Sequence, residues 1–483
     1  MNKILSKYIP ILFVFFSVLF LLYVFYKAEY LHHGSKAYYY KIYYIIGVIF
    51  LFFSIINFCL NKELKIKTSI IILSTIFSIY LIEGFLLVSG LGKIVVNRTV
   101  DLKNKQIRQI KLKKVPNFDT RSRIEIYEDM KIKNRDIVLA VYPKLFLRES
   151  NQQFFQLSGI SNKKTILCNE GGQYAIYQSD RYGFNNPDKE WDKKQVTFFL
   201  VGGSFVGGHC VNQKDTIGGN IRKKIKEGAV LSLGYGNNGP LIKHATLREY
   251  MPITNTKKVL WFYTEAEDKN SYNRINKEIN NSILLNYLNN KEFSQNLPLK
   301  QNDIDAKLKK ALQKETLIEQ QFHKTNPLLR FIKLTSFRRY TAERVFFASA
   351  VPSVDGGLEK IAEIISLSKS FTQKQGAKFY FIYIPHPSRY RMEELFDSKV
   401  QVDLEKYIIA ENNTPDFKNY EKIINSVKNL DIPVIDIYKE LHLTLKDPVG
   451  LYPFRLPGHY NELGYKLIVE TVLKKIEEYD RLE

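Results

Sequence analysis

Cysteine is scarce in this sequence: the 483 residues include only three, Cys59, Cys168 and Cys210. So few cysteines exclude a disulfide-rich secreted scaffold, and no pair has the spacing of a metal-binding motif. We therefore predict no metal and no cofactor. Cys59 falls inside a hydrophobic run. Cys168 and Cys210 either form a disulfide in an oxidising compartment or remain two buried thiols, and the sequence favours neither.

Negative charge is also in short supply. The chain has 49 acidic residues against 71 lysines and arginines, which gives a formal net charge of +22. A basic excess suits nucleic acid, an anionic membrane surface or an acidic substrate. Because zinc-finger spacing, RNA-binding aromatic pairs and long arginine-rich runs are all missing, we predict no nucleic-acid partner. The excess is mostly lysine, which a coding bias toward A and T explains as well as a partner does.

Long hydrophobic runs, by contrast, are concentrated in the first 92 residues. Three runs have about 19–23 residues each, enough to cross ~30 Å of hydrocarbon as helices. The first is too long for the core of a signal peptide, and no small-residue cleavage site precedes Lys27. We therefore predict a retained membrane anchor over residues 1–92, with three transmembrane helices in a lipid bilayer, at residues 8–26, 38–60 and 69–91.

The charges that flank these runs give conflicting signals about orientation. Lysines before the first run and between the second and third place the N-terminus in the cytoplasm, and so the soluble part outside; they are Lys3, Lys7, Lys62, Lys65 and Lys67. Five basic residues between positions 93 and 108 argue the other way. Since large domains are translocated largely regardless of charge, we predict an extracytoplasmic soluble domain.

Beyond the anchor, short β-rich runs alternate with helical patterns. The expected strands are 196–201, 229–233, 258–263, 378–384 and 433–437, and the expected helices are 216–226, 242–250, 358–375, 419–429 and 462–478. This alternation predicts βαβ units and a mostly parallel sheet in an α/β domain. We place that domain at residues 193–483, after a mixed α/β extension over 93–192. The polar stretch 269–345 is interpreted as a helical insertion over the active end of the sheet.

One serine and one histidine stand where such a sheet carries chemistry. Ligands bind at the carboxyl ends of parallel strands, and Ser204 follows the first strand directly. Gly202 and Gly203 allow a tight turn that presents its hydroxyl at the edge of the sheet. A serine is a weak nucleophile until a base, usually histidine, takes its proton. His459, in the loop before the last helix, is the histidine best placed to do so.

Four blocks in this domain resemble, in the same order, the motifs of the SGNH (GDSL-type) hydrolases. They read LVGGSF at 200–205, LSLGYGNNGP at 231–240, WFYTEAED at 261–268 and GHYNELGY at 458–465. The likeness covers about residues 192–479 and extends upstream to residues 168–171 and 180–187, as in membrane-tethered bacterial members. It implies that the soluble domain has a three-layer, flavodoxin-like SGNH fold. It also implies a protein anchored in the bacterial cytoplasmic (inner) membrane, with the soluble domain in the periplasm or otherwise outside the cytoplasm.

The resemblance also implies roles for individual residues. Ser204 would attack an ester carbonyl, and His459 would serve as general base and then general acid. The catalytic acid would be Asp447; Asp436 is a second candidate, and a Ser–His dyad without an acid is the third option. Candidates for stabilising the oxyanion or binding substrate are Gly203, Gly236, Asn237, Asn238 and Glu267.

Four positions depart from the family pattern. Gly203 replaces an aspartate, Asn237 takes the place of the oxyanion glycine, and Leu456 stands where the acid is expected. Glu267 replaces the oxyanion asparagine, and its anion would repel an oxyanion. We predict an esterase acting on acyl esters, in particular acetyl esters, of envelope glycans or lipid-linked sugars. The alternatives are an O-acyltransferase that modifies a polysaccharide and a catalytically degenerate binding or scaffold protein in envelope assembly.

Overall fold

A computed structural model provides the three-dimensional description of the chain. It describes residues 2–31, 37–88, 117–119, 121–147, 149, 152–265, 275, 277–323, 355–387, 415–455 and 458–482. The chain divides into two compact units, which are described separately. Unit 1 comprises residues 1–111 and 321–353, and unit 2 comprises residues 112–320 and 354–483.

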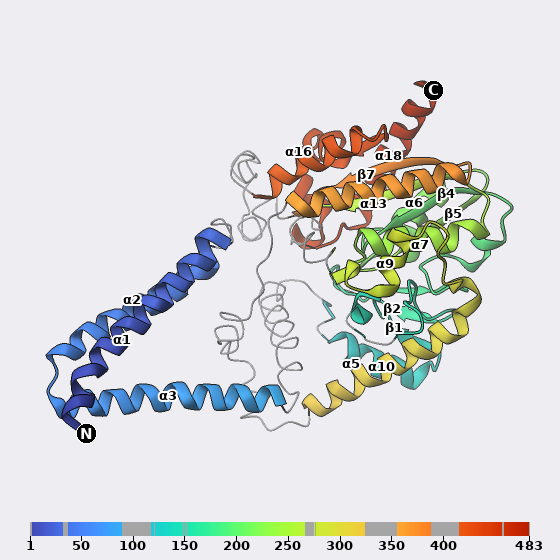
Figure 1. The fold of residues 1–483 in the computed structure, drawn as a ribbon. Coiled ribbons are helices and arrows are strands. Elements are labelled where there is room, and N and C mark those ends of the chain that lie inside the picture. Colours follow the sequence, from blue (N-terminus) through green and yellow to red (C-terminus); the bar gives the residue numbers. More distant parts are fainter. Residues whose placement is uncertain are drawn as a thin grey trace. The chain divides into compact units, whose positions relative to one another are not determined.

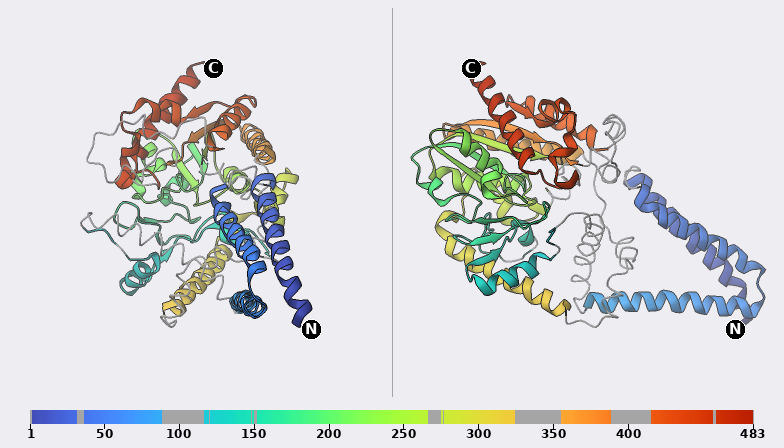
Figure 2. Two further views of the ribbon diagram at one scale, coloured as in Figure 1. Left: turned by 90° about the vertical axis from the view of Figure 1, so that its left-hand side faces the viewer. Right: turned by 180° about the vertical axis from the view of Figure 1, so that it is seen from behind.

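The described part of unit 1 consists of helices. Helix α1 (Asn2–Phe25) and helix α2 (Ala37–Ile56) lie side by side (Figures 1 and 2), and α3 (Lys62–Val88) follows. The hydroxyls of Ser17 and Ser54 are 3.1 Å apart across the α1–α2 contact. A Cβ on Gly47 would lie 2.5 Å from Leu21 Cδ2, so the small residue lets the two helices approach closely.

The prediction of three transmembrane helices is wrong in number. Among the described residues, one helix, Tyr8–Tyr30, is long and apolar enough to cross a membrane. Within the second run, the apolar helical segment Tyr43–Cys59 is shorter and belongs with apolar helices of 10–17 residues. Helix α3 begins with a charged turn that includes Lys62, Glu63 and Lys65.

Unit 2 is built around a parallel sheet, as predicted. Its strand order is β5-β4-β6-β7-β8, and every neighbouring pair is parallel. The strands are β4 (Val196–Gly202), β5 (Ala229–Gly234), β6 (Thr256–Thr264), β7 (Lys378–Ile384) and β8 (Val434–Asp436). Numbered along the chain this is the order 2-1-3-4-5 of flavodoxin-like sheets, whose ligands bind beyond the carboxyl ends of the strands where the order reverses. That point lies between β4 and β6.

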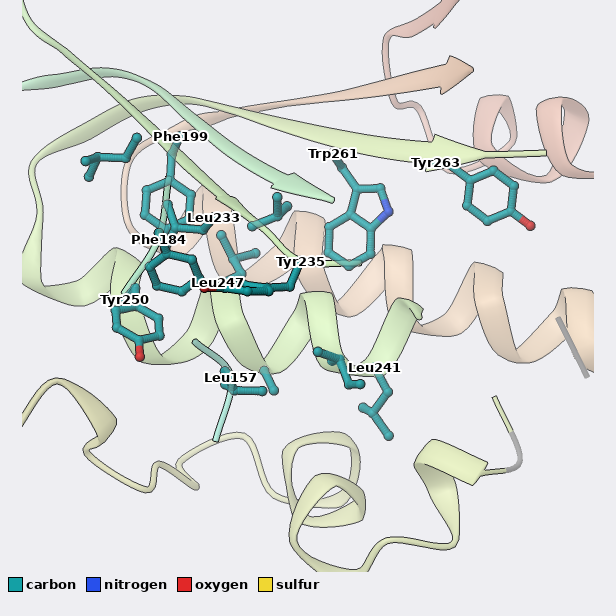
Figure 3. Packing of buried hydrophobic residues seen from close by; sticks show 14 of the residues in the cluster. Leu157, Phe184, Phe199, Leu233, Tyr235, Leu241, Leu247, Tyr250, Trp261 and Tyr263 are labelled. Atoms are coloured by element: carbon teal, nitrogen blue, oxygen red, sulfur yellow. The ribbon is translucent and has the colours of Figure 1, made fainter. Parts of the chain in front are cut away.

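Helices cover both faces of this sheet. Phe199 and Trp261 belong to the hydrophobic core shared with α7, α13 and α16 (Figure 3), whereas Leu200 and Phe262 belong to the core shared with α6 and α18. The alternation follows from the period of two along a strand that is buried on both faces. The helices are α6 (Ile217–Lys224), α7 (Pro240–Tyr250), α13 (Asp355–Lys374), α16 (Pro415–Lys428), α17 (Ile437–Glu440) and α18 (Glu462–Leu482).

Strand β5 lies at one edge of the sheet, and the loop that precedes β4 covers this edge. Asn186 accepts a hydrogen bond from the backbone N–H of Ser232 at 2.9 Å and donates to its carbonyl at 3.2 Å. Glu190 accepts from the N–H of Val230 at 2.9 Å. These side chains satisfy the backbone groups that a further strand would otherwise pair with, so the loop closes an edge that could aggregate.

The extension before the sheet is a small α/β layer of unit 2. Helix α5 (Arg123–Lys133) begins at a capping box formed by Ser122 and Glu125. It is followed by a three-stranded sheet of β1 (Ile137–Leu139), β2 (Lys164–Ile166) and β3 (Ile176–Gln178). Strands β2 and β3 form an antiparallel hairpin. The buried side chains of β1 share the hydrophobic core of α7, which ties this layer to the main sheet.

The described part of the insertion contains α9 (Ser282–Asn289) and α10 (Gln301–His323). Glu249, near the end of α7, accepts hydrogen bonds from the backbone N–H groups of Gln295 and Leu297. Gln295 also bonds both backbone groups of Phe155. Because α7 returns antiparallel to the strands, its last turn lies away from their carboxyl ends. The first turn of α7, near those carboxyl ends, is anchored too, since Glu278 of the insertion accepts from the N–H groups of Gly239 at 2.8 Å and Leu241 at 2.9 Å. The described insertion is therefore attached at both ends of α7.

A buried histidine makes the stability of unit 2 depend on pH. His244 on α7 is 2% exposed, and its Nδ1 lies 2.8 Å from the hydroxyl of Ser368 on α13. Burial, aided by the charge of Arg248, lowers the pKa of His244 to about 3. The unfolded chain binds a proton at this residue below about pH 6.5, whereas the folded state does not until the pH is far lower. The stability that His244 contributes is therefore complete above that pH and is lost as the pH falls.

We expect the free energy of unfolding to fall by about 2 kcal/mol between pH 6.5 and pH 5 because His244 is protonated in the unfolded chain and not in the folded one. Urea denaturation of the full-length protein in detergent, followed by tryptophan fluorescence, measures this. Both tryptophans, Trp191 and Trp261, lie in unit 2, so the signal reports on that unit alone. His244→Asn should lose this share of the pH dependence. An equal pH dependence in the variant and the wild type would contradict the prediction.

Candidate active site

Ser204 lies just beyond the carboxyl end of β4, as predicted, in a turn that only small residues can form. Gly202 pairs in register with Gly234 of β5, so the turns that follow both strands meet. A Cβ on Gly202 would lie 2.3 Å from Val206 Cγ2, and one on Gly234 would lie 2.6 Å from the nitrogen of Gly207. The close packing of the two turns fixes the backbone of Ser204, and its side chain is half-buried.

His209 holds the carbonyl of Ser204 in place. The backbone N–H of His209 donates to the Ser204 carbonyl at 3.1 Å, and Nδ1 of the same residue lies 3.0 Å from that oxygen. Because a carbonyl can only accept, Nδ1 carries the proton and Nε2 does not. Burial, together with the nearby charge of His459, lowers the pKa of His209 to about 3, so this imidazole is neutral near pH 7. We infer that His209 supports the turn and is not the base.

The loop before α18 presents His459 from a firmly anchored backbone. Asn461 caps α18 by accepting from the N–H of Gly464 at 2.9 Å, and its amide donates to the carbonyl of Gly450 at 2.8 Å. Tyr460 is fully buried in the core beneath α18. These contacts fix the residues on the C-terminal side of His459, while its own side chain remains 20% exposed and therefore accessible to a ligand.

Glu170 is the acid that contacts His459. One carboxylate oxygen, Oε1, lies 3.0 Å from Nδ1 of His459, and the other accepts from its backbone N–H at 2.6 Å. A Cβ on Gly458 would lie 2.5 Å from Glu170 Oε2, so glycine is required for the carboxylate to approach this backbone. A carboxylate on Nδ1 fixes both the ring orientation and the tautomer, leaving Nε2 as the acceptor.

Two ring contacts bring His459 to the turn of Ser204. The His459 ring lies 4.9 Å from the ring of Phe205 and 5.0 Å from that of His209, between centroids. Phe205 directly follows the serine, and His209 bonds its carbonyl. No hydrogen bond joins the Ser204 hydroxyl to His459 among the described residues. Catalytic hydrogen bonds commonly tighten only in the substrate complex.

Neither predicted acid is the partner of His459. Asp447 forms an ion pair with Arg455 in which Nη1 donates at 3.1 Å, and its Oδ1 accepts from the N–H of Gly450 at 3.1 Å. Asp436 caps α17 through the N–H of Tyr438 and accepts from the hydroxyl of Tyr420. Both carboxylates are thus engaged elsewhere, and the structure sets Glu170 in the place assigned to Asp447.

The candidate oxyanion residues occupy different environments. Gly203 and Gly236 are buried, and a Cβ on Gly236 would lie 2.9 Å from Nε2 of His209, so this glycine borders the site. Asn237 is exposed and has a φ of 64°, in the left-handed region. Asn238 is 1% exposed, and neither of its amide side-chain atoms has a partner among the described residues. Glu267 lies outside the described residues.

Cys168 and Cys210 form a disulfide, which settles the alternative left open by the sequence. Glu170, Cys210 and His459 each place a potential metal-ligand atom within 4.8 Å of the others. A disulfide sulfur is not a thiolate, however, and only the thiolate is a good metal ligand. In the oxidised protein the cluster therefore offers one carboxylate and one imidazole, fewer than the three ligands of a catalytic zinc site.

The chain was compared with known proteins on the basis of both sequence and structure. No protein-family model matches it, and no curated protein matches it. A solved structure of a G-D-S-L family protein from Desulfitobacterium hafniense DCB-2, provisionally described as lipolytic, is similar with a TM-score of 0.29 and 11% identity, over 58% of this chain and 99% of that one. At so low a TM-score, the functional inference has to come from the residues of the site itself.

Proposed function

We propose that unit 2 is an ester hydrolase of the SGNH type that uses Ser204 as nucleophile and His459 as base. The observation that carries the proposal is the Glu170–His459 pair, held against the turn of Ser204 at the carboxyl end of β4. A carboxylate, an imidazole and a serine in this arrangement have the parts of a catalytic triad. Glu170 also supplies the acid that was missing at Leu456, which weakens the interpretation as a degenerate site.

Each residue has a defined chemical task in this reaction. Glu170 accepts the hydrogen bond from Nδ1–H of His459, so Nε2 takes the proton of the Ser204 hydroxyl as the oxygen attacks the ester carbonyl. The protonated imidazole then gives that proton to the departing alcohol, and an acyl-serine remains. Water, deprotonated by the same Nε2, attacks the acyl-serine and releases the carboxylic acid and free Ser204. Glu170 stabilises the imidazolium in both halves of the reaction.

The substrate that suits this site is an acyl ester on an envelope glycan or a lipid-linked sugar. Both side chains of the Glu170–His459 pair are partly exposed, at 17% and 20%, so a bulky alcohol portion can remain outside the protein. The net charge of +22 favours an acidic polymer, and the apolar helix Tyr8–Tyr30 would hold the enzyme at a membrane where such glycans are built. The proposed location is the extracytoplasmic face of a bacterial inner membrane.

Asn238 is the side chain best suited to donate to the oxyanion. Burying an amide without a hydrogen-bond partner destabilises a protein, so an unpartnered amide in the turn after β5 indicates a group kept for a ligand. We expect Asn238→Ala to lower kcat by about 10²- to 10³-fold, the usual effect of losing one oxyanion donor. The same change should leave the stability unchanged or raise it, because the unpaired amide is removed.

Gln156 provides a matched control for Asn238. It is also fully buried, and neither atom of its side-chain amide has a partner among the described residues. It follows Phe155, which is bonded through Gln295 to the far end of α7, away from the site. Gln156→Ala should therefore preserve kcat while Asn238→Ala does not. Hydrolysis of p-nitrophenyl acetate and urea denaturation of both variants measure this, and equal kcat values would remove Asn238 from the proposed mechanism.

Labelling with a fluorophosphonate tests the proposed function most directly. The full-length protein in detergent is treated with the probe, and the modified residue is identified by mass spectrometry. Modification of Ser204 in the wild type, and its absence in His459→Ala, would support an activated serine. Incubation with an acetylated glycan then separates hydrolysis from transfer, since free acetate indicates hydrolysis and a newly acetylated glycan indicates transfer. A chain that neither reacts with the probe nor hydrolyses p-nitrophenyl acetate is not an esterase.

A further inference from the structure

Glu170 reaches His459 from the tip of a hairpin. The pairing of β2 and β3 continues through Leu167, whose N–H donates to the carbonyl of Ala175 at 2.9 Å. The chain then turns, and Oδ1 of Asn169 accepts from the N–H of Gly172 at 2.8 Å. This turn projects from a sheet of strands three residues long. So short a hairpin needs a further attachment to hold a side chain at its tip in one position.

Asp119 bonds the tip on one side, donating from its N–H to the carbonyl of Gly172 at 2.8 Å and accepting at its own carbonyl from Asn169 at 2.9 Å. The disulfide adds a covalent attachment, and both of its ends are close to the residues of the proposed site. Cys168 stands two positions before Glu170 in the sequence. Cys210 directly follows His209, the residue whose ring and backbone both bond the carbonyl of Ser204. The disulfide thus joins the hairpin that carries Glu170 to the turn that carries Ser204. Cys210 has a φ of 68°, a left-handed conformation that is unusual for residues other than glycine and needs support from its surroundings.

We propose that the Cys168–Cys210 disulfide is a positioning element of the active site. It holds the hairpin at the distance from which Glu170 bonds both the ring and the backbone of His459, so the acid–base pair is complete only in the oxidised protein. The inference rests on the proposed function of this site and adds to it a dependence on redox state. The enzyme would be active in an oxidising compartment and nearly silent before the disulfide forms.

The redox step is a thiol–disulfide exchange with an external dithiol. Two successive thiolate attacks break the Cys168–Cys210 bond, leave two protein thiols and convert the dithiol to its cyclic disulfide. The carboxylate then loses its fixed distance from the ring. A displacement of about 1 Å in such a group lowers turnover by about 10²-fold. The effect should fall on kcat more than on KM, since Glu170 stabilises the imidazolium that forms during the reaction.

A double-mutant cycle distinguishes positioning from general support of the fold. It is carried out on the full-length protein in detergent in a Cys59→Ser background, because Cys59 is exposed and would otherwise form intermolecular disulfides. Glu170→Ala, the pair Cys168→Ser with Cys210→Ser, and their combination are compared with the wild type by p-nitrophenyl acetate hydrolysis. If the disulfide acts through Glu170, its loss lowers kcat in the wild type and has little further effect in Glu170→Ala. Losses that multiply would overturn the proposal.

Hydrogen exchange gives a second readout that does not need catalysis. The backbone N–H of His459 donates to Glu170 at 2.6 Å, so its exchange should accelerate equally in Glu170→Ala and after reduction. If exchange is faster after reduction but the protein never hydrolyses an ester, the disulfide does position Glu170 and the proposed function is wrong. Unchanged exchange in an active protein would reject the positioning role alone.

Two controls complete the experiment. Reduction is also carried out chemically, with dithiothreitol in the presence of EDTA, because the freed thiol of Cys210 could otherwise bind a metal together with Glu170 and His459. Activity should return on reoxidation. Tryptophan fluorescence should stay native throughout. Its loss on reduction would overturn the proposal, since the disulfide would then support the whole fold.

Discussion

Replacing Ser204 or His459 by alanine should lower kcat for p-nitrophenyl acetate by about 10³-fold or more. The serine forms the covalent bond, and the histidine both removes and returns the proton, so neither half of the reaction proceeds without them. Because the two act as one unit, the double variant should be hardly slower than either single variant. If the loss of kcat in the double variant equals the product of the two single losses, the residues act in separate steps.

The two variants should differ in their reaction with an active-site probe. Ser204→Ala removes the atom that a fluorophosphonate modifies, whereas His459→Ala keeps it and removes only its activation. Both should remain folded, because Ser204 is held through its carbonyl and His459 through the backbone around Asn461. Native tryptophan fluorescence with unchanged kcat in either variant would remove that residue from the mechanism.

The parallel sheet and the position of Ser204 could be predicted because both depend on local signals. Runs such as β4 and β7 are almost wholly apolar and are bounded by turns or polar residues, and their alternation with helices determines a parallel arrangement. The glycines on either side of the serine turn likewise act within a few residues. The loop of His459 is fixed by the cap of the helix that follows it, which is also a local feature.

Glu170 could not be predicted as the acid because it lies 289 residues from His459 in sequence. The resemblance directed attention to the acids just before the histidine, and Asp447 lies in that segment. The contact depends on a hairpin whose tip reaches the loop of His459 and on Gly458, which leaves room for the carboxylate. The sequence signals were indirect: the family resemblance includes residues 168–171, and Cys168 stands two positions before Glu170, so a disulfide to Cys210 would bring that segment to the turn of Ser204.

Glu170→Ala is accordingly expected to lower kcat by about 10²- to 10⁴-fold, the range seen when the acid of a triad is changed. Without the carboxylate the His459 ring loses its preferred tautomer and the charge that stabilises its protonated form. Glu170→Gln should also be slow, because an amide can donate to Nδ1 and so favour the tautomer with the proton on Nε2. KM should change little, since Glu170 contacts the base and not the substrate.

Asp447→Asn is the matched comparison that separates the two acids. Its carboxylate pairs with Arg455, with both side chains 42% exposed, so the change should lower stability by no more than about 1 kcal/mol and leave kcat at the wild-type level. If kcat instead falls in Asp447→Asn and not in Glu170→Ala, the acid lies where the family resemblance put it. The Glu170–His459 contact would then serve only to attach the hairpin. If Glu170→Ala alone is slow, the catalytic acid of this domain comes from the extension before the sheet, and that small layer is part of the active site.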